Sequence, residues 1–358
     1  MSSRQFTPFG GSGEIVTLDN INEYDDLPPL AEIDSPDVYE IRTGALGTDY
    51  LVPMQDGSTD FNEWYSLVDG QIILDIPDIV GLGSQDDNGY IHLIDDGSLK
   101  TTLSDPTNNA AGIEITEEYT YLASEDSNIY VYETGSWELI TTLTEAGSAS
   151  TRYVAANDEY VAYHDYFGDD NVYVHNISDW SLEYELMEAT DTVSNVDINS
   201  GYVFYSSFDD RVYVHDLSDG SLVEESLTSD SVNFISASES KYCYDNGTDV
   251  DVRSIGDWNE EFVLTQSSDG LNGGSITSDF VAYGGTDENV YVHDVSDGSL
   301  VQTLSESGRV IQDVELSENN IIYGGDDDVG YLHTVSDWSL SQELTEAERE
   351  IFGVSILE

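Results

Sequence analysis

Histidine is the residue type whose spacing in this sequence most suggests chemistry. Five of the six histidines recur at one position of an internal repeat, and two further copies carry Tyr or Arg there. These residues are His92, His175, His215, His293 and His333, with Tyr132 and Arg253 in the other two copies. Imidazole binds zinc, but all ligands of one ion lie about 2 Å from it. Equivalent positions of repeats around a ring point away from one another, so we expect packing between repeats and no metal.

Carboxylates recur in a second pattern, as short acidic turns that precede the histidine-bearing segments. The turns comprise residues 85–88, 125–128, 168–171, 208–210, 286–289 and 326–328. Clustered carboxylates bind Ca²⁺ or Mg²⁺, but no turn has the spaced D-x-D-x-D-G pattern with a distal bidentate Glu. In a chain with 73 Asp and Glu, solvated turns are the expectation. We expect no cofactor, and weakly held Ca²⁺ or Mg²⁺ on these turns is the alternative.

Tryptophan forms the third pattern. Four of the five tryptophans occupy one turn position of the repeat, and the other copies have Gly97, Gly220 or Gly298 there. The four are Trp137, Trp180, Trp258 and Trp338. Aromatic side chains are enriched at binding interfaces and stack on sugars. We predict these turns as the candidate binding residues, with packing over the edge of their own repeat as the competing interpretation.

Catalytic motifs are not found in the sequence. It has no G-x-S-x-G elbow, no glycine-rich phosphate loop and no H-E-x-x-H. Cys243 replaces an aromatic residue of other repeats, which indicates a buried structural thiol. Carboxylate pairs for glycoside hydrolysis are unspecific in so acidic a chain. We therefore expect a protein that is not an enzyme, with a glycan-cleaving spike as a lesser alternative.

The elements that would position these residues follow from the repeat itself. Seven copies start at residues 88, 128, 171, 211, 249, 289 and 329, separated by 40, 43, 40, 38, 40 and 40 residues. Each copy contains four short strand patterns with turn signals every 8–12 residues, which is typical of one propeller blade. We predict an all-β fold, with a seven-bladed β-propeller over residues 76–358.

Closure of the ring is expected at the C-terminus. The first copy has little room for an innermost strand, whereas residues 350–358 form an unpaired strand pattern after the seventh copy. Docking that strand into the first blade would remove two open sheet edges. Residues 72–76 could compete for this place, and a degenerate eighth blade from residues 49–75 is the alternative.

The core segment Val-Tyr-Val-His-Asp resembles WD40-like and quinoprotein-like propeller repeats, with His where a WD repeat carries Trp. The resemblance covers about 280 residues. It implies architecture only, because propellers have many unrelated functions.

Composition narrows the partners. Nine Lys and Arg against 73 Asp and Glu give a net charge of −64, which disfavours nucleic acid and anionic membranes. The aromatic residues lie in a regular strand pattern, which argues against disorder. Molar salt would screen the self-repulsion of such a surface, so we expect a halophilic protein from an archaeon or its virus. The sequence shows no signal peptide and no membrane-spanning stretch.

The first 75 residues lack the repeat. We expect an extended attachment arm over residues 1–47 and a small β module over residues 48–75. This region resembles a short module of tailed-virus virion proteins, such as tail fibre and decoration proteins. The positions that carry the resemblance are Leu27-Pro28, Val38-Tyr39, Tyr50-Leu51-Val52, and Asp56-Gly57 followed by Trp64.

Together these features predict a virion structural protein of a haloarchaeal tailed virus. Residues 1–75 would contact other virion proteins, and the propeller would be displayed to bind a host-surface glycan or S-layer protein, or to decorate capsid or tail. We expect a homo-oligomer in the particle, without nucleic acid or membrane insertion. The alternative is a cytoplasmic interaction scaffold of a halophilic archaeon.

Overall fold

The computed structural model describes residues 77–147, 150–166, 168 and 170–358, together with the backbone of five short strands nearer the N-terminus. The chain divides into two compact units, Met1–Ile76 and Pro77–Glu358. All elements in the described residues are β-strands. The described residues contain no helix that could cross a membrane.

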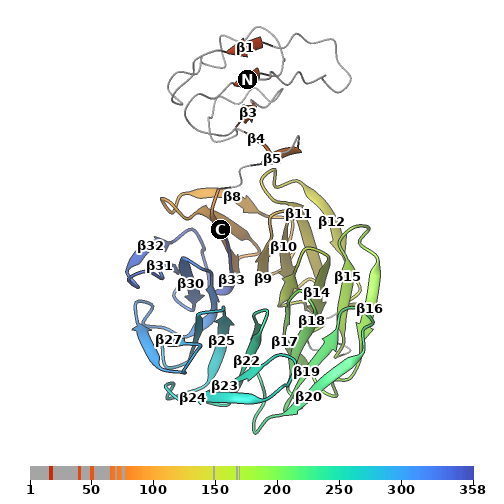
Figure 1. Cartoon of the computed structure of the whole chain (residues 1–358), viewed down its shortest axis with the longest axis vertical. Helices are drawn as coiled ribbons and strands as arrows, with labels where there is room; N and C mark the ends of the chain where they lie inside the picture. Colours follow the sequence, from red (N-terminus) through yellow and green to blue (C-terminus); the bar gives the residue numbers. More distant parts are fainter. Residues whose placement is uncertain are drawn as a thin grey trace. The chain divides into compact units, whose positions relative to one another are not determined.

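Residues 77–358 form the predicted seven-bladed propeller, a closed ring of seven four-stranded antiparallel sheets (Figure 1). From the innermost to the outermost strand, blade 1 contains β33 (Ile351–Leu357), β6 (Ile79–Ser84), β7 (Gly89–Leu93) and β8 (Leu99–Leu103), and blade 2 contains β9 (Ala110–Ile115), β10 (Tyr119–Ser124), β11 (Asn128–Glu133) and β12 (Leu139–Leu143). Blade 3 contains β13 (Val154–Ala156), β14 (Tyr160–His164), β15 (Val172–Asn176) and β16 (Leu182–Leu186), and blade 4 contains β17 (Val193–Ile198), β18 (Tyr202–Ser207), β19 (Arg211–Asp216) and β20 (Leu222–Leu227). Blade 5 contains β21 (Ile235–Ala237), β22 (Lys241–Asn246), β23 (Asp249–Ser254) and β24 (Glu260–Leu264). Blade 6 contains β25 (Leu271–Ile276), β26 (Phe280–Gly285), β27 (Val290–Asp294) and β28 (Leu300–Leu304), and blade 7 contains β29 (Ile311–Leu316), β30 (Asn320–Gly325), β31 (Gly330–Thr334) and β32 (Leu340–Leu344).

The ring closes as predicted. The C-terminal strand β33 pairs antiparallel with β6, from Ile351 opposite Ser84 to Leu357 opposite Ile79. Ile351 and Val354 are buried in the core between blades 7 and 1. The last strand of the chain therefore supplies the innermost strand of the first blade, which leaves neither end of the ring with an open edge.

The N-terminal unit contains a separate five-stranded sheet. Its strands are β1 (Val16–Leu18), β2 (Tyr39–Ile41), β3 (Asp49–Leu51), β4 (Tyr65–Val68) and β5 (Gln71–Leu74), in that order. Strand β5, which could have competed for blade 1, pairs with β4, and the described strands of residues 49–75 belong to this sheet and not to an eighth blade. Most of the proposed attachment arm and virion-like module, including Leu27, Pro28 and Trp64, lies outside the described residues.

The hydrophobic core lies between neighbouring blades. Strands in the middle of a blade are covered on both faces, which explains their near-continuous apolar sequence. One core cluster, for example, joins Val172 and Val174 of blade 3 to Val193, Val196 and Tyr205 of blade 4.

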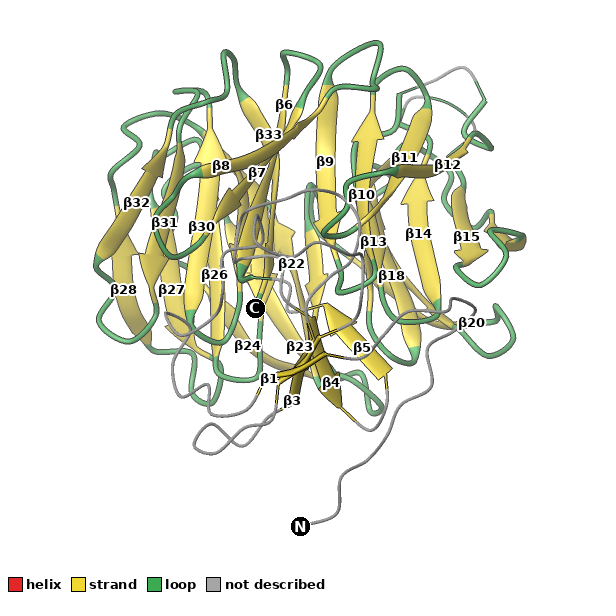
Figure 2. Ribbon diagram, turned by 90° about the horizontal axis from the view of Figure 1, so that it is seen from above, coloured by secondary structure: helices red, strands yellow, loops and turns green. Residues whose placement is uncertain are grey.

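The strands run between the two faces of the ring, so the turns gather at these faces (Figure 2). The turns between second and third strands and the linkers between blades share one face, here called the linker face. The turns between first and second strands, and those between third and fourth strands, share the opposite one. Because the four tryptophans lie in the latter turns, we call this the tryptophan face.

Candidate functional site

The repeated histidines tie the strands of each blade to a turn on the tryptophan face. In all five, Nδ1 lies 3.0–3.1 Å from the carbonyl oxygen of the turn residue five positions later, which is Gly or Trp. A carbonyl only accepts, so Nδ1 must donate and carry the hydrogen. In blade 5, Arg253 reaches the carbonyl of Trp258 in the same way. The predicted structural role of these side chains is consistent with this geometry.

The other ring nitrogen of the histidine faces the neighbouring strand and the preceding blade. In blades 3, 4, 6 and 7, Nε2 lies 3.1–3.3 Å from a tyrosine hydroxyl of the second strand. In three of these blades the tyrosine hydroxyl donates to a glutamate from the end of the preceding blade: Tyr163 to Glu145, Tyr205 to Glu188 and Tyr323 to Glu306. Since a hydroxyl has one hydrogen, it cannot donate to Nε2 at the same time. We call this His–Tyr–Glu group the blade clamp. Burial lowers the pKa of His92, His293 and His333, which favours the neutral imidazole.

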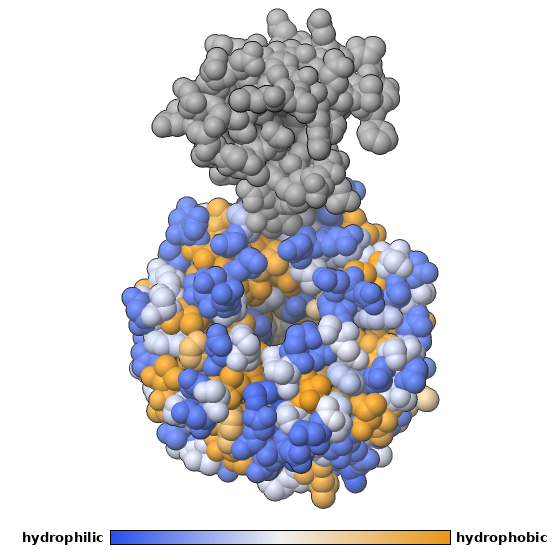
Figure 3. All heavy atoms as spheres, in the orientation of Figure 1, coloured by the Kyte–Doolittle hydropathy of each residue, from blue (hydrophilic) through white to orange (hydrophobic). Residues whose placement is uncertain are grey.

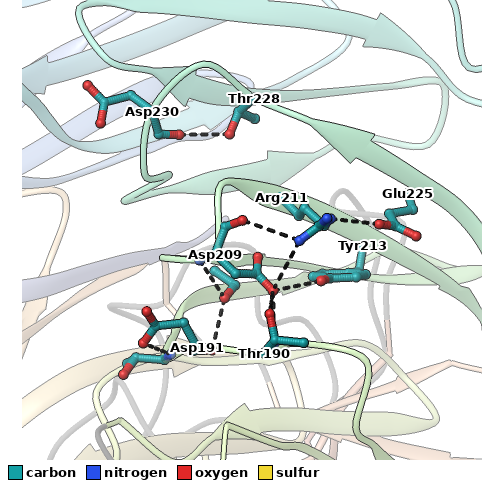
Figure 4. A network of polar contacts seen from close by, with 10 residues as sticks. Thr190, Asp191, Asp209, Arg211, Tyr213, Glu225, Thr228 and Asp230 are labelled. Atoms are coloured by element: carbon teal, nitrogen blue, oxygen red, sulfur yellow. Dashed lines mark hydrogen bonds and ion pairs between the residues drawn. The ribbon is translucent and has the colours of Figure 1, made fainter.

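The acidic turns on the linker face have a structural function that the sequence did not reveal. In five blades one aspartate accepts from a tyrosine hydroxyl four residues later, at 2.7–2.9 Å: Asp86, Asp126, Asp209, Asp287 and Asp327. The same oxygen also accepts from the linker before its blade, as at Asp209, which binds the amide of Thr190 at 2.8 Å (Figure 4). These aspartates thus fasten the linker to its blade in five of the seven blades.

The tryptophan turns fill space between blades. Trp137, Trp180, Trp258 and Trp338 all have a positive φ of 58–61°, and each is half-buried. Three of the rings pack edge-on against the preceding blade: Trp180 against Tyr119, Trp258 against Tyr202, and Trp338 against Phe280. The packing therefore reaches the preceding blade in all three cases, and Trp258 in addition packs edge-on against Tyr242 of its own blade.

Glycine replaces tryptophan where the preceding blade fills the same space. A Cβ at Gly220 would lie 2.6 Å from the Tyr184 ring, and one at Gly298 would lie 3.1 Å from the Phe262 ring. The space between two neighbouring blades is thus filled by a large side chain from one of them, either the tryptophan of the turn or an aromatic residue of the preceding blade. A binding role for the tryptophans remains a prediction, because each ring is still partly exposed.

A broad depression lies on the tryptophan face. It has a volume of about 640 Å³ and is lined by the first turns of blades 3 to 6, at residues 157–159, 198–200, 237–240 and 276–278. The turns are joined across blades, since Asn157 donates to the carbonyl of Asn199 and Asn199 donates to that of Ser238. We call this depression the cup. Figure 3 shows that the ring is hollowed at its centre.

Below the cup, the innermost strands enclose a smaller cavity of about 150 Å³ on the ring axis. It shares Ile198, Ala237 and Ile276 with the cup. Each of the seven innermost strands contributes one residue at the same register position, and these residues form a ring around the axis. From blade 1 to blade 7 these are Ser355, Glu114, Ala155, Asp197, Ser236, Ser275 and Glu315. Several bond to the next blade, as Asp197 does by accepting from the amide of Ala237.

We call this smaller cavity the channel cavity. Four carboxylates line it: Glu114, Asp197, Asp313 and Glu315. None of the residues that line it carries a positive charge. Burial raises the pKa of Asp197 to about 6 and that of Asp313 to about 7. Burial and the neighbouring carboxylates raise the pKa values of Glu114 and Glu315 well above their usual range. The cavity thus gathers four carboxyl groups without a positively charged partner among its lining residues, and their raised pKa values show that ionising all of them together is unfavourable.

These carboxylates are not among the residues predicted from the sequence, although the sequence contains a signal for them. Six of the seven innermost strands have an acidic, hydroxyl or small residue one position before their last apolar residue, as in the segments 113–115, 196–198 and 314–316. The signal is visible only after the strands are aligned in register.

Cys243 is buried in blade 5, as expected, and burial raises the pKa of its thiol. Among the described residues, no three His, Cys, Asp or Glu side chains lie close enough together to chelate a metal ion. Comparison with protein-family models and with curated proteins finds no match to this chain. The antiparallel seven-bladed ring itself is consistent with WD40-like repeats.

Proposed function

We propose that this protein is a non-enzymatic binding protein whose ring engages a partner through the rim of the tryptophan face. The observation that carries this proposal is a set of exposed leucines. The first residue of the outermost strand is Leu in six blades, with 37–45% of each side chain exposed: Leu99, Leu139, Leu182, Leu222, Leu300 and Leu340.

Three of them, Leu139, Leu182 and Leu340, come two residues after the half-buried tryptophan of their turn, and the other three come two residues after a glycine. Repeated exposed apolar side chains mark interaction surfaces. The repeated polar side chains, in contrast, are engaged in blade clamps and linker contacts, which supports a rigid platform.

Salt adds a physical argument for apolar recognition. At the ionic strength expected for so acidic a chain, the Debye length is about 3 Å, and attraction between charged surfaces is screened. Apolar contacts are not weakened in this way. A partner that lies on this rim would therefore be held by leucine and tryptophan contacts.

The setting that we propose is the virion of a haloarchaeal tailed virus, with a host-surface glycan or S-layer protein as the partner. It is supported by the virion-like sequence pattern of residues 27–64. Mass spectrometry of purified particles tests the setting. Recovery of the chain in particles supports it, and recovery only in host cytosol would favour the cytoplasmic scaffold instead.

The binding surface is tested separately, with purified S-layer glycoprotein and the full-length chain at 3 M KCl. Replacing Leu182 and Leu222 by Glu should weaken binding at least 10-fold. The matched control replaces Met187 and Leu227 by Glu, since these residues are 66% and 72% exposed near the other end of the same two outer strands. Equal loss in both variants, or in neither, would refute the proposed rim.

A further inference from the structure

The channel cavity contains a charge imbalance that a ligand could relieve. Glu114, Asp197 and Glu315 occupy equivalent register positions of the innermost strands β9, β17 and β29. Asp313 lies two residues before Glu315 on β29. Removing ionised carboxylates from water costs several kcal/mol each unless a proton or a cation accompanies them. No lysine or arginine lines the cavity, so the compensating charge has to come from solution.

An independent observation concerns Asn195. This residue is only 8% exposed and lines the cavity, and its side chain makes no hydrogen bond to any other residue in the described part of the chain. It points to the same side of β17 as Asp197, because side chains alternate along a strand and Val196 between them is buried in the blade core. Its amide atoms are not closed off from the cavity, so a water molecule or a ligand there can accept from the amide or donate to it.

The donor atoms define the class of ligand. The polar side chains lining the cavity offer oxygen from carboxylates, hydroxyls and an amide, and no thiol or imidazole lines it. Hard divalent cations prefer such oxygen ligands. Because no three acidic side chains converge closely enough for direct chelation, the ion would keep most of its water.

The space is sufficient for a hydrated ion. A buried water needs about 10–15 Å³ of such volume, so a cavity of about 150 Å³ holds an ion with a full shell of six waters. Mg²⁺ loses its water reluctantly and is usually held by one or two carboxylates through retained waters. We propose that the channel cavity binds one hydrated divalent cation of the Mg²⁺ type, between the carboxylates of blades 2, 4 and 7 and the amide of Asn195.

Such an ion would link blades that do not touch one another directly. It would enter through the cup, whose floor shares residues with the cavity. Bound at the axis, it would oppose outward movement of blades 2, 4 and 7 together. The site is therefore a stabilising centre of the ring and is independent of the rim leucines.

Mn²⁺ serves as the test probe, since it replaces Mg²⁺ and is detected by electron paramagnetic resonance. Full-length protein at 3 M KCl should show one site per chain, at least 10-fold tighter than the weak surface sites and displaced by Mg²⁺. Water-proton relaxation should report several retained waters. Asp197→Asn and Asn195→Ala should each weaken this site at least 10-fold, whereas Asp210→Asn, at an exposed carboxylate of the linker face, should not.

Folding is checked in the same samples by melting without divalent ion. Asn195→Ala removes a side chain that makes no hydrogen bond, so it tests the site even where Asp197→Asn lowers stability. The proposal is overturned if no stoichiometric site is found. It is also overturned if a well-folded Asn195→Ala variant binds as the unaltered protein does, or if Asp210→Asn weakens binding equally.

Discussion

At the scale of residues, adjacent aspartates of one turn have different roles. Oδ2 of Asp209 accepts from the amide and hydroxyl of Thr190 and from the hydroxyl of Tyr213. Asp210 is exposed, and its side chain makes no hydrogen bond. Figure 4 shows Asp209 between the linker and its own blade. Of the two acidic residues of this turn, Asp210 is thus solvated and Asp209 holds the linker.

Asp209 and Asp210 are adjacent, so replacing either of them by asparagine removes one negative charge from the same turn. Asp209→Asn should lower the free energy of unfolding by about 1–2 kcal/mol, because hydrogen bonds to a charged acceptor are about twice as strong as neutral ones. In addition, Oδ1 of Asp209 is buried without a partner, so an amide nitrogen would find no acceptor there. Urea unfolding at constant 3 M KCl measures the effect.

Asp210→Asn is the matched control and should change stability by less than about 0.5 kcal/mol. Equal effects of the two substitutions would mean that net charge, and not the hydrogen bonds of Asp209, decides the contribution of this turn.

The sequence predicted the residue roles unevenly. The histidine position was recognised as structural because five equivalent residues in separate repeats cannot converge on one ion. The aspartate of each acidic turn was not distinguished from its neighbours, since its partners are a tyrosine four residues later and, in four of the blades, a linker residue 19 or 20 residues earlier. The alternation of Trp and Gly remained unexplained because the filling side chains, such as Tyr184 and Phe262, lie in the preceding blade.

At the scale of elements, the closing strand was predictable because the repeat leaves one strand missing at the start and one extra at the end. Its register was not predicted, because a shift between Ile351 and Gly353 interrupts the alternation of side chains. The channel carboxylates were not predicted, because their proximity depends on the register of seven strands around an axis. The N-terminal sheet lacks a repeat, so its strand order could not be derived from periodicity.

Truncation after Arg349 tests the role of β33. It should lower the free energy of unfolding by more than about 5 kcal/mol, which is comparable to the whole stability of many domains. The reason is that removal exposes the edge of β6 and empties the core positions of Ile351 and Val354. Thermal melting at 3 M KCl, followed by circular dichroism, measures it.

Removal of Glu358 alone serves as the control for that truncation. It eliminates the hydrogen bonds of this side chain to Asn319 and Asn320 but keeps the strand, so the melting temperature should fall by only a few degrees. If truncation after Arg349 leaves the melting curve unchanged, blade 1 does not need its C-terminal strand.

At the scale of the whole molecule, the closed ring stabilises the fold and the net charge destabilises it. The ring is closed by β33, and each blade buries apolar side chains against two neighbours. The chain nevertheless has a formal net charge of −64, and only three cation-to-carboxylate ion pairs of Lys or Arg closer than 3.5 Å occur in the described residues, at Arg152, Arg211 and Lys241. Most carboxylate repulsion must therefore be screened by ions and not by basic side chains.

Stability should depend strongly on salt for this reason. The Debye length rises from about 3 Å at 1 M to about 10 Å at 0.1 M, so that neighbouring carboxylates begin to repel when KCl is diluted. We expect the melting temperature to fall by more than about 10 °C between 3 M and 0.1 M KCl, since self-repulsion destabilises the compact state. Differential scanning calorimetry with a chelator present excludes any contribution of divalent ions. Sucrose at 0.1 M KCl should restore only part of the loss, because it strengthens burial without screening charge. A melting temperature that does not change with KCl would show that the acidic surface is already compensated within the fold.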